Sequence, residues 1–322
     1  MTIPKVLACL TFILFAAIAF AAWWKSDRQL EAPVASQPRE QEIVLEQTIR
    51  VVEPKVLEPQ VVKPIEKPKP KEADPLEVDR VEELFNITGK KLPIVETIVY
   101  KSHVPWNKGK LAWLSDYASH YHTSRHFIAR SRNGKPDYLK QDLAEGDKFN
   151  VLKPDIKLQF NAIIDLNRSK MWLYYNDLDN GSKELIKTYL VGLGRSALTP
   201  SGQYLLGDRI ATYKPGQFGT HNGAKVELIR IFGTRWIPFS KELGPNPGSP
   251  RGLGMHGVPW KENEKGELVE DTSSLGKFQS DGCIRLSTND MEELYSIVIT
   301  KPCVVEIVND FSAATFPVAE RE

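Results

Sequence analysis

The chain has 322 residues, 41% of them hydrophobic, which is enough for one ordinary catalytic domain plus a smaller module. Its 42 lysine and arginine residues nearly balance its 41 aspartate and glutamate residues, so the net charge of +1 argues against a nucleic acid partner. The three cysteines, Cys9, Cys283 and Cys303, are too few for a scaffold held together by disulfides.

The first segment, residues 6–24, is an uncharged apolar run flanked by lysines. It is about long enough to cross a bilayer as a helix, and it ends in Trp23 and Trp24, a residue type enriched at membrane interfaces. We therefore predict that residues 1–26 anchor the chain in the inner membrane. A cleaved signal sequence is the alternative, because residues 19–21 satisfy the small-x-small cleavage rule. Both interpretations place the remainder in the periplasm or cell wall.

Residues 27–75 contain eight prolines and neither glycine nor an aromatic residue. Such a segment cannot build a core, and we expect a semi-rigid stalk that reaches on the order of 150 Å at about 3.1 Å per residue. A plain disordered tether is the alternative. Residues 76–98 should follow as a short helical lead-in, because Leu84 and Phe85 continue a partial helical period that Gly89 can stop.

A small α+β module is predicted at residues 99–154. A first helix carries apolar residues on one face, a second begins after Ser124, and a short strand covers residues 149–151. This order resembles a LysM module, a βααβ fold that binds the glycan of peptidoglycan or chitin. The resemblance implies glycan as a partner. Four histidines lie here, but no acidic or thiol partner stands at ligand spacing, so we predict no metal and no cofactor: His103, His120, His122 and His126.

From residue 159 the sequence changes to short β-type runs separated by turn signals such as Asn180-Gly181. We predict a mostly β domain with one or two short helices over residues 159–310, followed by a tail at 311–322. The distinct helix should begin at Ser287, where Asp290 completes a capping box. Its inward face should consist of four residues: Met291, Leu294, Tyr295 and Val298.

Cys283 lies in a turn of small residues, Ser-Asp-Gly-Cys, where Gly282 allows a close backbone approach and leaves amide donors beside the sulfur. A nucleophilic thiol also needs a base or cation that holds it as thiolate. His256 is the better base, because His221 lies in a polar loop. Cys303 stands in a strand pattern and should be an inert core residue. We predict a thiol enzyme with Cys283 as nucleophile and His256 as base.

Three motifs in order resemble the L,D-transpeptidase catalytic domain, the YkuD family, over roughly residues 160–309: Thr-Pro-Ser-Gly at 199–202, His-Gly at 256–257, and residues 280–285, which match the family signature Ser-His-Gly-Cys-Ile-Arg. The resemblance implies acyl transfer on peptidoglycan stem peptides. Cys283 would attack the carbonyl between an L and a D residue of a tetrapeptide, release the terminal D-alanine, and pass the acyl group to an amine of a neighbouring stem.

The resemblance also implies roles for residues around the thiol. The Gly257 carbonyl would orient the His256 imidazole, and the amides of Gly282 and Cys283 would form the oxyanion hole. Arg285 would meet a substrate carboxylate or form a structural salt bridge, two alternatives that the sequence leaves open. The expected substrate contacts are Arg285, Ser280, Asp281 and Met255, with Ser280 also bracing the turn.

Asp281 stands where the family most often has histidine, and a carboxylate that pointed inward would raise the thiol pKa. Asp281 must therefore face outward, or activity is altered. The loop between His256 and Ser280 is also longer than usual and polar, which is typical of part of a lid.

Three hypotheses about function follow. The first is a transpeptidase that remodels peptidoglycan, and the second is an L,D-carboxypeptidase on the same scaffold, in which water takes the acyl group. The third is an inactive anchor protein in which the LysM-like module binds the cell wall. The sequence does not separate the acceptors, and it does not give the oligomeric state.

Overall fold

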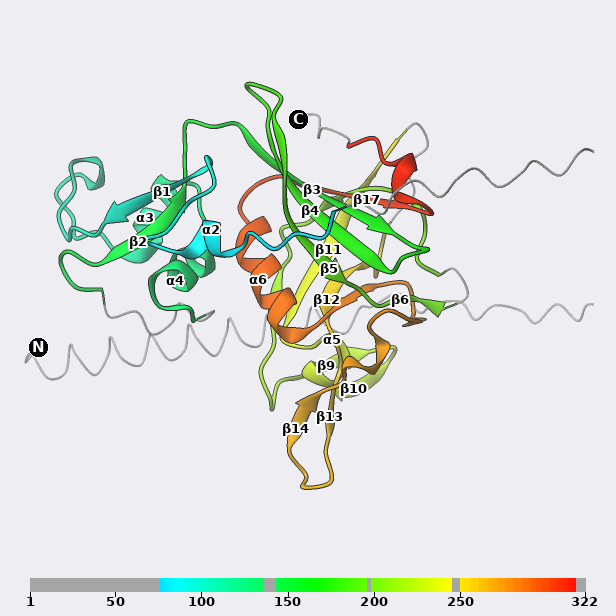
Figure 1. Cartoon of the computed structure of the whole chain (residues 1–322). Coiled ribbons are helices and arrows are strands. Elements are labelled where there is room, and N and C mark those ends of the chain that lie inside the picture. The colour runs from blue at the N-terminus through cyan, green and yellow to red at the C-terminus, as the bar shows by residue number, and fades with distance from the viewer. Residues whose placement is uncertain (1–75, 136–142, 196–197, 245–249, 317–322) are drawn as a thin grey trace, which may run out of the picture. The chain divides into compact units, whose positions relative to one another are not determined.

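The computed structural model describes residues 76–135, 143–195, 198–244 and 250–316 (Figure 1). The predicted anchor at 1–26 and the predicted stalk at 27–75 lie outside the described residues. Within the described ranges, none of the helices combines the length and the hydropathy that a membrane-spanning segment requires.

The first part of the described chain is a small α+β module built around one pair of strands. Strands β1 and β2 pair antiparallel, with Val95 opposite Leu152, and α4 packs against β2. Strand β1 thus begins inside the range predicted as a helical lead-in, because the run Val-Glu-Thr-Ile-Val is rich in β-branched residues that favour a strand. The elements are α2 (Glu82–Phe85), β1 (Val95–Val99), η1 (Pro105–Asn107), α3 (Leu114–His120), α4 (Arg125–Asn133) and β2 (Lys148–Leu152).

The second part is mostly β, as predicted, and its main sheet has nine strands. Their order is β16-β12-β11-β7-β17-β3-β4-β5, with β8 paired to β11. The strands are β3 (Leu158–Asp165), β4 (Lys170–Asp177), β5 (Lys183–Leu190), β6 (Leu193–Gly194), β7 (Gly202–Leu206), β8 (Ala211–Thr212), β9 (Phe218–His221), β10 (Ala224–Glu227), β11 (Arg235–Leu243), β12 (Gly254–Gly257), β13 (Trp260–Glu262), β14 (Leu268–Glu270), β15 (Phe278–Ser280), β16 (Ile284–Leu286) and β17 (Cys303–Val308). The helices are α5 (Ile229–Phe232), η3 (Thr272–Ser274), α6 (Thr288–Val298) and η4 (Phe311–Ala313).

Strand β17 lies in the middle of this sheet, parallel to β3 and antiparallel to β7. Strand β3 is buried along its whole length, and β17 is buried except at its last residue, which is typical of strands covered on both faces. Cys303 opens β17 and is 1% exposed, and burial raises the pKa of its thiol well above the ordinary value. The prediction that Cys303 is a core residue is confirmed.

Helix α6 begins after Ser287, as the capping box predicted. The Ser287 hydroxyl accepts from the Asp290 amide at 3.2 Å and donates to the Asp290 carboxylate at 2.7 Å. The predicted inward stripe is buried: Met291, Leu294, Tyr295 and Val298. Because these residues join the core beneath β12 and β16, the helix lies directly behind the strands that carry the candidate catalytic residues.

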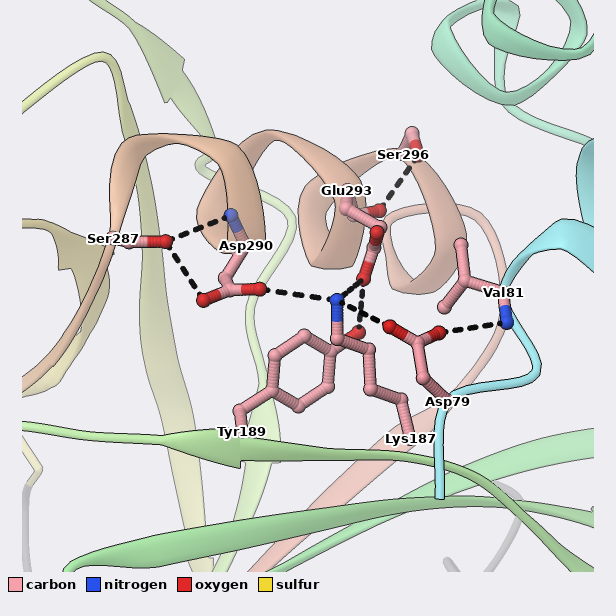
Figure 2. Close-up of polar contacts among 8 residues, drawn as sticks. All are labelled: Asp79, Val81, Lys187, Tyr189, Ser287, Asp290, Glu293 and Ser296. Atoms are coloured by element: carbon pink, nitrogen blue, oxygen red, sulfur yellow. Dashed lines mark hydrogen bonds and ion pairs between the residues drawn. The ribbon is translucent and has the colours of Figure 1, made fainter. Parts of the chain in front are cut away.

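A cluster of ionised groups joins α6 to β5 and to the lead-in (Figure 2). The Lys187 amine lies 2.9 Å from Glu293, 3.1 Å from Asp290 and 3.3 Å from Asp79. Burial acts to lower the pKa of Lys187, but the hydrogen bond and charge of Glu293, with Asp290, outweigh it and raise that pKa above its ordinary value. The Tyr189 hydroxyl donates to the Glu293 carboxylate at 2.9 Å.

The small module and the β domain share one hydrophobic cluster. Phe127 of α4 and Leu152 of β2 belong to the same buried cluster as Tyr295 of α6. The Ser124 hydroxyl donates to the Ser296 carbonyl at 2.6 Å across the junction, and both groups are buried. The contact between α4 and α6 is therefore a packed interface with a satisfied buried hydrogen bond.

Candidate active site

The candidate nucleophile and base come from two neighbouring parallel strands. In the register of β12 and β16, Met255 lies opposite Ile284 and His256 lies opposite Arg285. Met255 and Ile284 are fully buried in the core. Because side chains alternate along a strand, His256 and Arg285 face the other side of the sheet. Cys283 stands directly before β16, and the Arg285 charge acts on both the Cys283 thiol and the His256 imidazole, so Arg285 lies near both.

Met255 does not belong to this face. It was predicted to contact substrate, but it is 0% exposed and packs in the core cluster with Ile284 and Leu294. The physical reason is the strand period of two, which turns the neighbour of an outward His256 inward. We remove Met255 from the candidate substrate contacts.

The His256 imidazole is held by the backbone of its neighbour. Its Nδ1 lies 2.7 Å from the Gly257 carbonyl oxygen, as the family resemblance implied for Gly257. A carbonyl only accepts, so Nδ1 carries the proton and Nε2 keeps its lone pair. The side chain is 3% exposed, and burial lowers its pKa to about 4. The imidazole is therefore neutral near pH 7 and able to take a proton.

Aromatic rings from α5 and β11 fix the plane of this imidazole. The Phe232 ring meets it edge to face at a centroid distance of 5.5 Å, and the Trp236 ring lies 5.7 Å away. Gly233 ends α5 with φ +62°, and a Cβ there would lie 2.7 Å from the Gly257 carbonyl carbon. Only glycine allows this close approach. Gly233 was not among the predicted site residues, because its contact with Gly257 joins segments distant in sequence and leaves no local signal.

The Cys283 thiol is protonated at rest. Burial raises its pKa to about 11, although the Gly254 amide and the Arg285 charge act in the opposite direction. The thiol donates to the Gly252 carbonyl, with Sγ 3.3 Å from the oxygen. We expected a base to hold a thiolate in readiness, and the structure differs: burial lowers the pKa of His256 and raises that of Cys283, which favours a neutral imidazole and a neutral thiol.

The turn before Cys283 is braced by Ser280. The Ser280 hydroxyl donates to the Cys283 carbonyl at 2.6 Å and accepts from the Gly282 amide at 3.2 Å. Gly282 has φ +117°, and a Cβ there would lie 2.8 Å from the Leu198 carbonyl oxygen. The Gly282 amide thus already has an acceptor inside the turn, which differs from the expectation that it serves an oxyanion together with the Cys283 amide.

Thr199 supports the same turn from the other side, and sequence reasoning gave it no role beyond the Thr-Pro-Ser-Gly motif. Its hydroxyl donates to the Gly282 carbonyl at 3.0 Å and accepts from the Gly194 amide at 2.7 Å. The side chain is 3% exposed. A Cβ on Gly194 would lie 2.9 Å from the Gly282 Cα, so these three residues are in close contact.

Asp281 and Arg285 point to different surroundings. The Asp281 carboxylate pairs with Arg195 at 2.6 Å, and both side chains are about two-thirds exposed, at 69% and 65%. Asp281 therefore faces outward.

Arg285 is half-buried, and its Nε is buried without a hydrogen-bond partner in the part of the chain that the structure describes. Burial lowers its pKa from the ordinary value. A guanidinium with an unpartnered N–H group can donate a charge-assisted hydrogen bond to the carboxylate of a ligand.

The polar insert between His256 and Ser280 contains the hairpin of β13 and β14, which projects beside β9 and β10 in Figure 1. Arg230 of α5 links the two hairpins through ion pairs with Glu227 of β10, at 2.7 Å, and with Glu262 of β13. That the insert acts as a lid stays a prediction.

Two of the four histidines of the small module have ring contacts. His120 stacks on Trp106 at a centroid distance of 4.2 Å, and His126 meets the Tyr295 ring edge to face. Among the described residues, no three His, Cys, Asp or Glu side chains are grouped so as to hold a metal ion.

Comparison with known proteins found a family match for the β domain. Residues 160–307 match the family model of the L,D-transpeptidase catalytic domain, YkuD. A putative L,D-transpeptidase YkuD from Bacillus licheniformis is 28% identical over 149 residues, or 46% of this chain. The chain spans 65% of that relative's length. The resemblance predicted for this domain is confirmed, while the LysM resemblance of residues 99–154 stays a prediction.

Among solved structures, the comparison matched Bdellovibrio bacteriovorus Bd1075, with a TM-score of 0.32 at 15% identity over 47% of this chain and 48% of that one. Pgp2 from Campylobacter jejuni, described as a helical cell shape determining protein, has a TM-score of 0.31 at 19% identity over 48% and 49% of the two chains. L,D-transpeptidase 1 from Mycobacterium tuberculosis has a TM-score of 0.25 at 14% identity over 52% and 67%.

Proposed function

We propose that the L,D-transpeptidase family domain at residues 160–307 remodels peptidoglycan by acyl transfer through a thioester on Cys283. The observation that carries the proposal is the hydrogen bond from His256 Nδ1 to the Gly257 carbonyl, made on the strand beside the Cys283 turn. With Nδ1 held by that carbonyl, the proposal assigns Nε2 the role of general base toward the Cys283 thiol.

The proton moves during attack rather than before it. Burial holds the pKa of Cys283 near 11 and that of His256 near 4, so a thiolate-imidazolium pair is disfavoured at rest. As the sulfur attacks the carbonyl carbon of the L-D amide, His256 Nε2 takes the thiol proton. When the C–N bond breaks, the imidazolium returns that proton to the departing amine of D-alanine.

The second half of the reaction uses the same groups. An amine of a neighbouring stem attacks the thioester carbon, loses a proton to Nε2 and releases the sulfur, which recovers the proton. Arg285 binds the free carboxylate of the donor stem, because its guanidinium is half-buried and carries an unpartnered Nε. The positive charge of Arg285 also lowers the pKa of the thiol as the sulfur becomes negative.

The hypothesis of an inactive anchor is less favoured, although the Asp281 charge still raises the pKa of the Cys283 thiol. It rested on Asp281, whose carboxylate would oppose a thiolate if it faced the sulfur. The pairing with Arg195 at 2.6 Å turns the carboxylate toward an exposed cation. This arrangement favours an active domain over a degenerate one.

The test uses the full chain in mild detergent, incubated with tetrapeptide muropeptides that are then separated and weighed by mass spectrometry. Cross-linked dimers support the proposed transfer, and shortened monomers without dimers assign an L,D-carboxypeptidase instead. Products from a Cys283→Ala chain equal to those of the parent would remove Cys283 from the chemistry. Cys303→Ala, a buried cysteine on a core strand, is the matched control and should keep activity.

A further inference from the structure

The segment that follows β5 runs along the whole turn of Cys283. The backbone of Gly192 exchanges two hydrogen bonds with that of Arg285, at 2.8 and 2.9 Å. Strands β6 and β15 then pair in parallel, and the residues that directly follow these two strands are Arg195 and Asp281. Their side chains meet at 2.6 Å. This ion pair is therefore part of the wall of the turn that carries the candidate nucleophile.

The Asp281 carboxylate lies close enough to the sulfur for its charge to act there. Burial is the main cause of the raised pKa of the Cys283 thiol, and the Asp281 charge adds to it. Salt screens the interaction between exposed charges beyond about 10 Å at 0.1 M ionic strength. A ligand group that pairs with Asp281 is therefore near the acyl carbon that Cys283 would carry.

A carboxylate at this place opposes the first half of the proposed reaction, because it disfavours negative charge on the attacking sulfur of Cys283. A residue that weakens one step and still stands beside the reacting atoms is expected where another step gains from it. The second half of the reaction brings a group of the opposite charge. An amine acceptor is mostly an ammonium ion at neutral pH, and Asp281 attracts that ion toward the thioester.

The ion pair of Asp281 with Arg195 can open at little cost, because both side chains are exposed, at 69% and 65%, and such pairs contribute little to stability. An α-amino acid carries an ammonium and a carboxylate on one carbon. It can exchange partners with the pair, so that its ammonium meets Asp281 and its carboxylate meets the planar guanidinium of Arg195. This exchange leaves neither side chain without a partner.

We propose that Asp281 and Arg195 determine the specificity for the acceptor, and that they select an α-amino acid group over water. The inference rests on the proposed function, because it begins from the acyl group on Cys283. The bound ammonium gives one proton to water, and the free amine attacks the thioester carbon. The C–N bond forms, the C–S bond breaks, and a second proton passes from the nitrogen through His256 to the sulfur.

The test measures how the acyl group is divided between an amine and water. The full chain in mild detergent is incubated with a tetrapeptide muropeptide and either D-2-aminobutyric acid or propylamine, which is the same molecule without its carboxylate. Mass spectrometry gives the ratio of the amine product to the hydrolysed tripeptide. Both products come from one acyl-enzyme, so this ratio does not depend on the rate of the first half-reaction.

Asp281→Asn should lower the ratio for both amines about two- to fivefold, because each amine offers an ammonium. Arg195→Gln should lower it about two- to fivefold for D-2-aminobutyric acid only. Asp179→Asn is the matched control, because it removes the carboxylate of another exposed ion pair, with Lys157 at 3.2 Å. Asp179 lies between β4 and β5, at the opposite end of the strand order from β16, and its loss should leave both ratios unchanged.

An unchanged ratio in Asp281→Asn overturns the proposal. An equal loss for the two amines in Arg195→Gln overturns the recognition of the acceptor carboxylate.

A chain with both Arg195→Asp and Asp281→Arg separates acceptor specificity from stability, because it keeps an ion pair of reversed polarity at the same place. Its Tm should stay near that of the parent. The ratio for both amines should stay as low as in Asp281→Asn, because a cation now stands where the acceptor ammonium would bind. A ratio restored to that of the parent would assign the pair a structural role and overturn the proposal.

Binding without turnover distinguishes the failure of this proposal from the failure of the proposed function. In a Cys283→Ala chain, the NMR signals of D-2-aminobutyric acid should broaden, and Asp281→Asn should reduce that broadening. Such binding with no product from the parent chain removes the proposed function alone. Amine products whose ratio to the hydrolysed tripeptide is the same in Asp281→Asn remove the acceptor proposal alone.

Discussion

The Thr199 hydroxyl donates a hydrogen bond to the Gly282 carbonyl at 3.0 Å and so fixes the residue immediately before the candidate nucleophile. The same oxygen accepts from the Gly194 amide, which ties β6 to the Cys283 turn. The thiol is therefore aimed by a residue 84 positions earlier in the chain, 283 minus 199.

Replacing Thr199 with valine should lower turnover at least about tenfold and lower the free energy of unfolding by about 1–3 kcal/mol, because the Gly194 amide is left buried without an acceptor. Thr199→Ser keeps the hydroxyl and should retain most activity. Turnover of a tetrapeptide muropeptide and urea denaturation are the measurements. Equal losses in the serine and valine variants would show that shape rather than hydrogen bonding matters at this position.

His256 should make the fold sensitive to acid. Its pKa is lowered by burial from 6.5 to about 4, so the unfolded chain binds a proton that the folded chain refuses. The stabilisation is complete above about pH 6.5 and is lost as the pH falls toward 4. Between pH 7 and pH 5 the loss should be about 2 kcal/mol, measured by urea denaturation. His256→Gln should remove this part of the slope, and an unchanged slope would contradict the buried neutral imidazole.

Cys283 should react slowly with iodoacetamide at pH 7 and faster as the pH rises, because its pKa is about 11. Asp281→Asn should raise the rate about two- to fivefold, because the Asp281 charge raises that pKa and its removal also leaves Arg195 without its partner. Peptide mapping after timed alkylation gives both rates, with the buried Cys303 as the unreactive internal reference. A slower Asp281→Asn chain would exclude this electrostatic role.

Arg285 should matter for substrate and little for the fold. Arg285→Met should raise KM for stems with a free carboxylate by about 30–100-fold, as the loss of a charge-assisted contact predicts, with a smaller effect on kcat. Tm should stay the same or rise, because the guanidinium has a buried Nε without a partner in the described chain. A sharp loss of Tm would instead assign Arg285 a structural ion pair.

Lys187→Met should destabilise the fold by about 3–5 kcal/mol, because burial raises the pKa of Glu293 and the loss of the Lys187 amine removes the charge that opposes this shift. Glu293→Gln in the same chain should restore part of the loss, since it removes the Glu293 charge and keeps a partner for Tyr189. Urea denaturation of the single and double variants gives the coupling. Additive losses would show that the cluster in Figure 2 contributes no cooperative energy.

Local sequence signals predicted α6 and the burial of Cys303, because a capping box and an apolar strand run depend on neighbours in the chain. The prediction that Met255 contacts substrate was wrong. Strand alternation could have shown this, because the neighbour of His256 on the same strand points to the opposite side of the sheet. The Asp281–Arg195 pair and the Thr199–Gly282 contact join residues more than 80 positions apart, and no local pattern encodes such contacts. The pairing of β12 with β16, which brings the strand of His256 beside the strand that follows Cys283, is likewise a contact between distant segments that no local pattern encodes.

The position of β17 also bears on the order in which the domain can be completed. This strand is the last of the sheet in the chain, yet it lies between β7, on the side of the candidate catalytic residues, and β3, which leads to β4 and β5. Until residues 303–308 are synthesised, the two halves lack the ladder that joins them, so a chain that stops earlier leaves two incomplete half-sheets with open edges. Synthesis must therefore reach the end of β17 before the Cys283 turn and His256 stand on a closed scaffold.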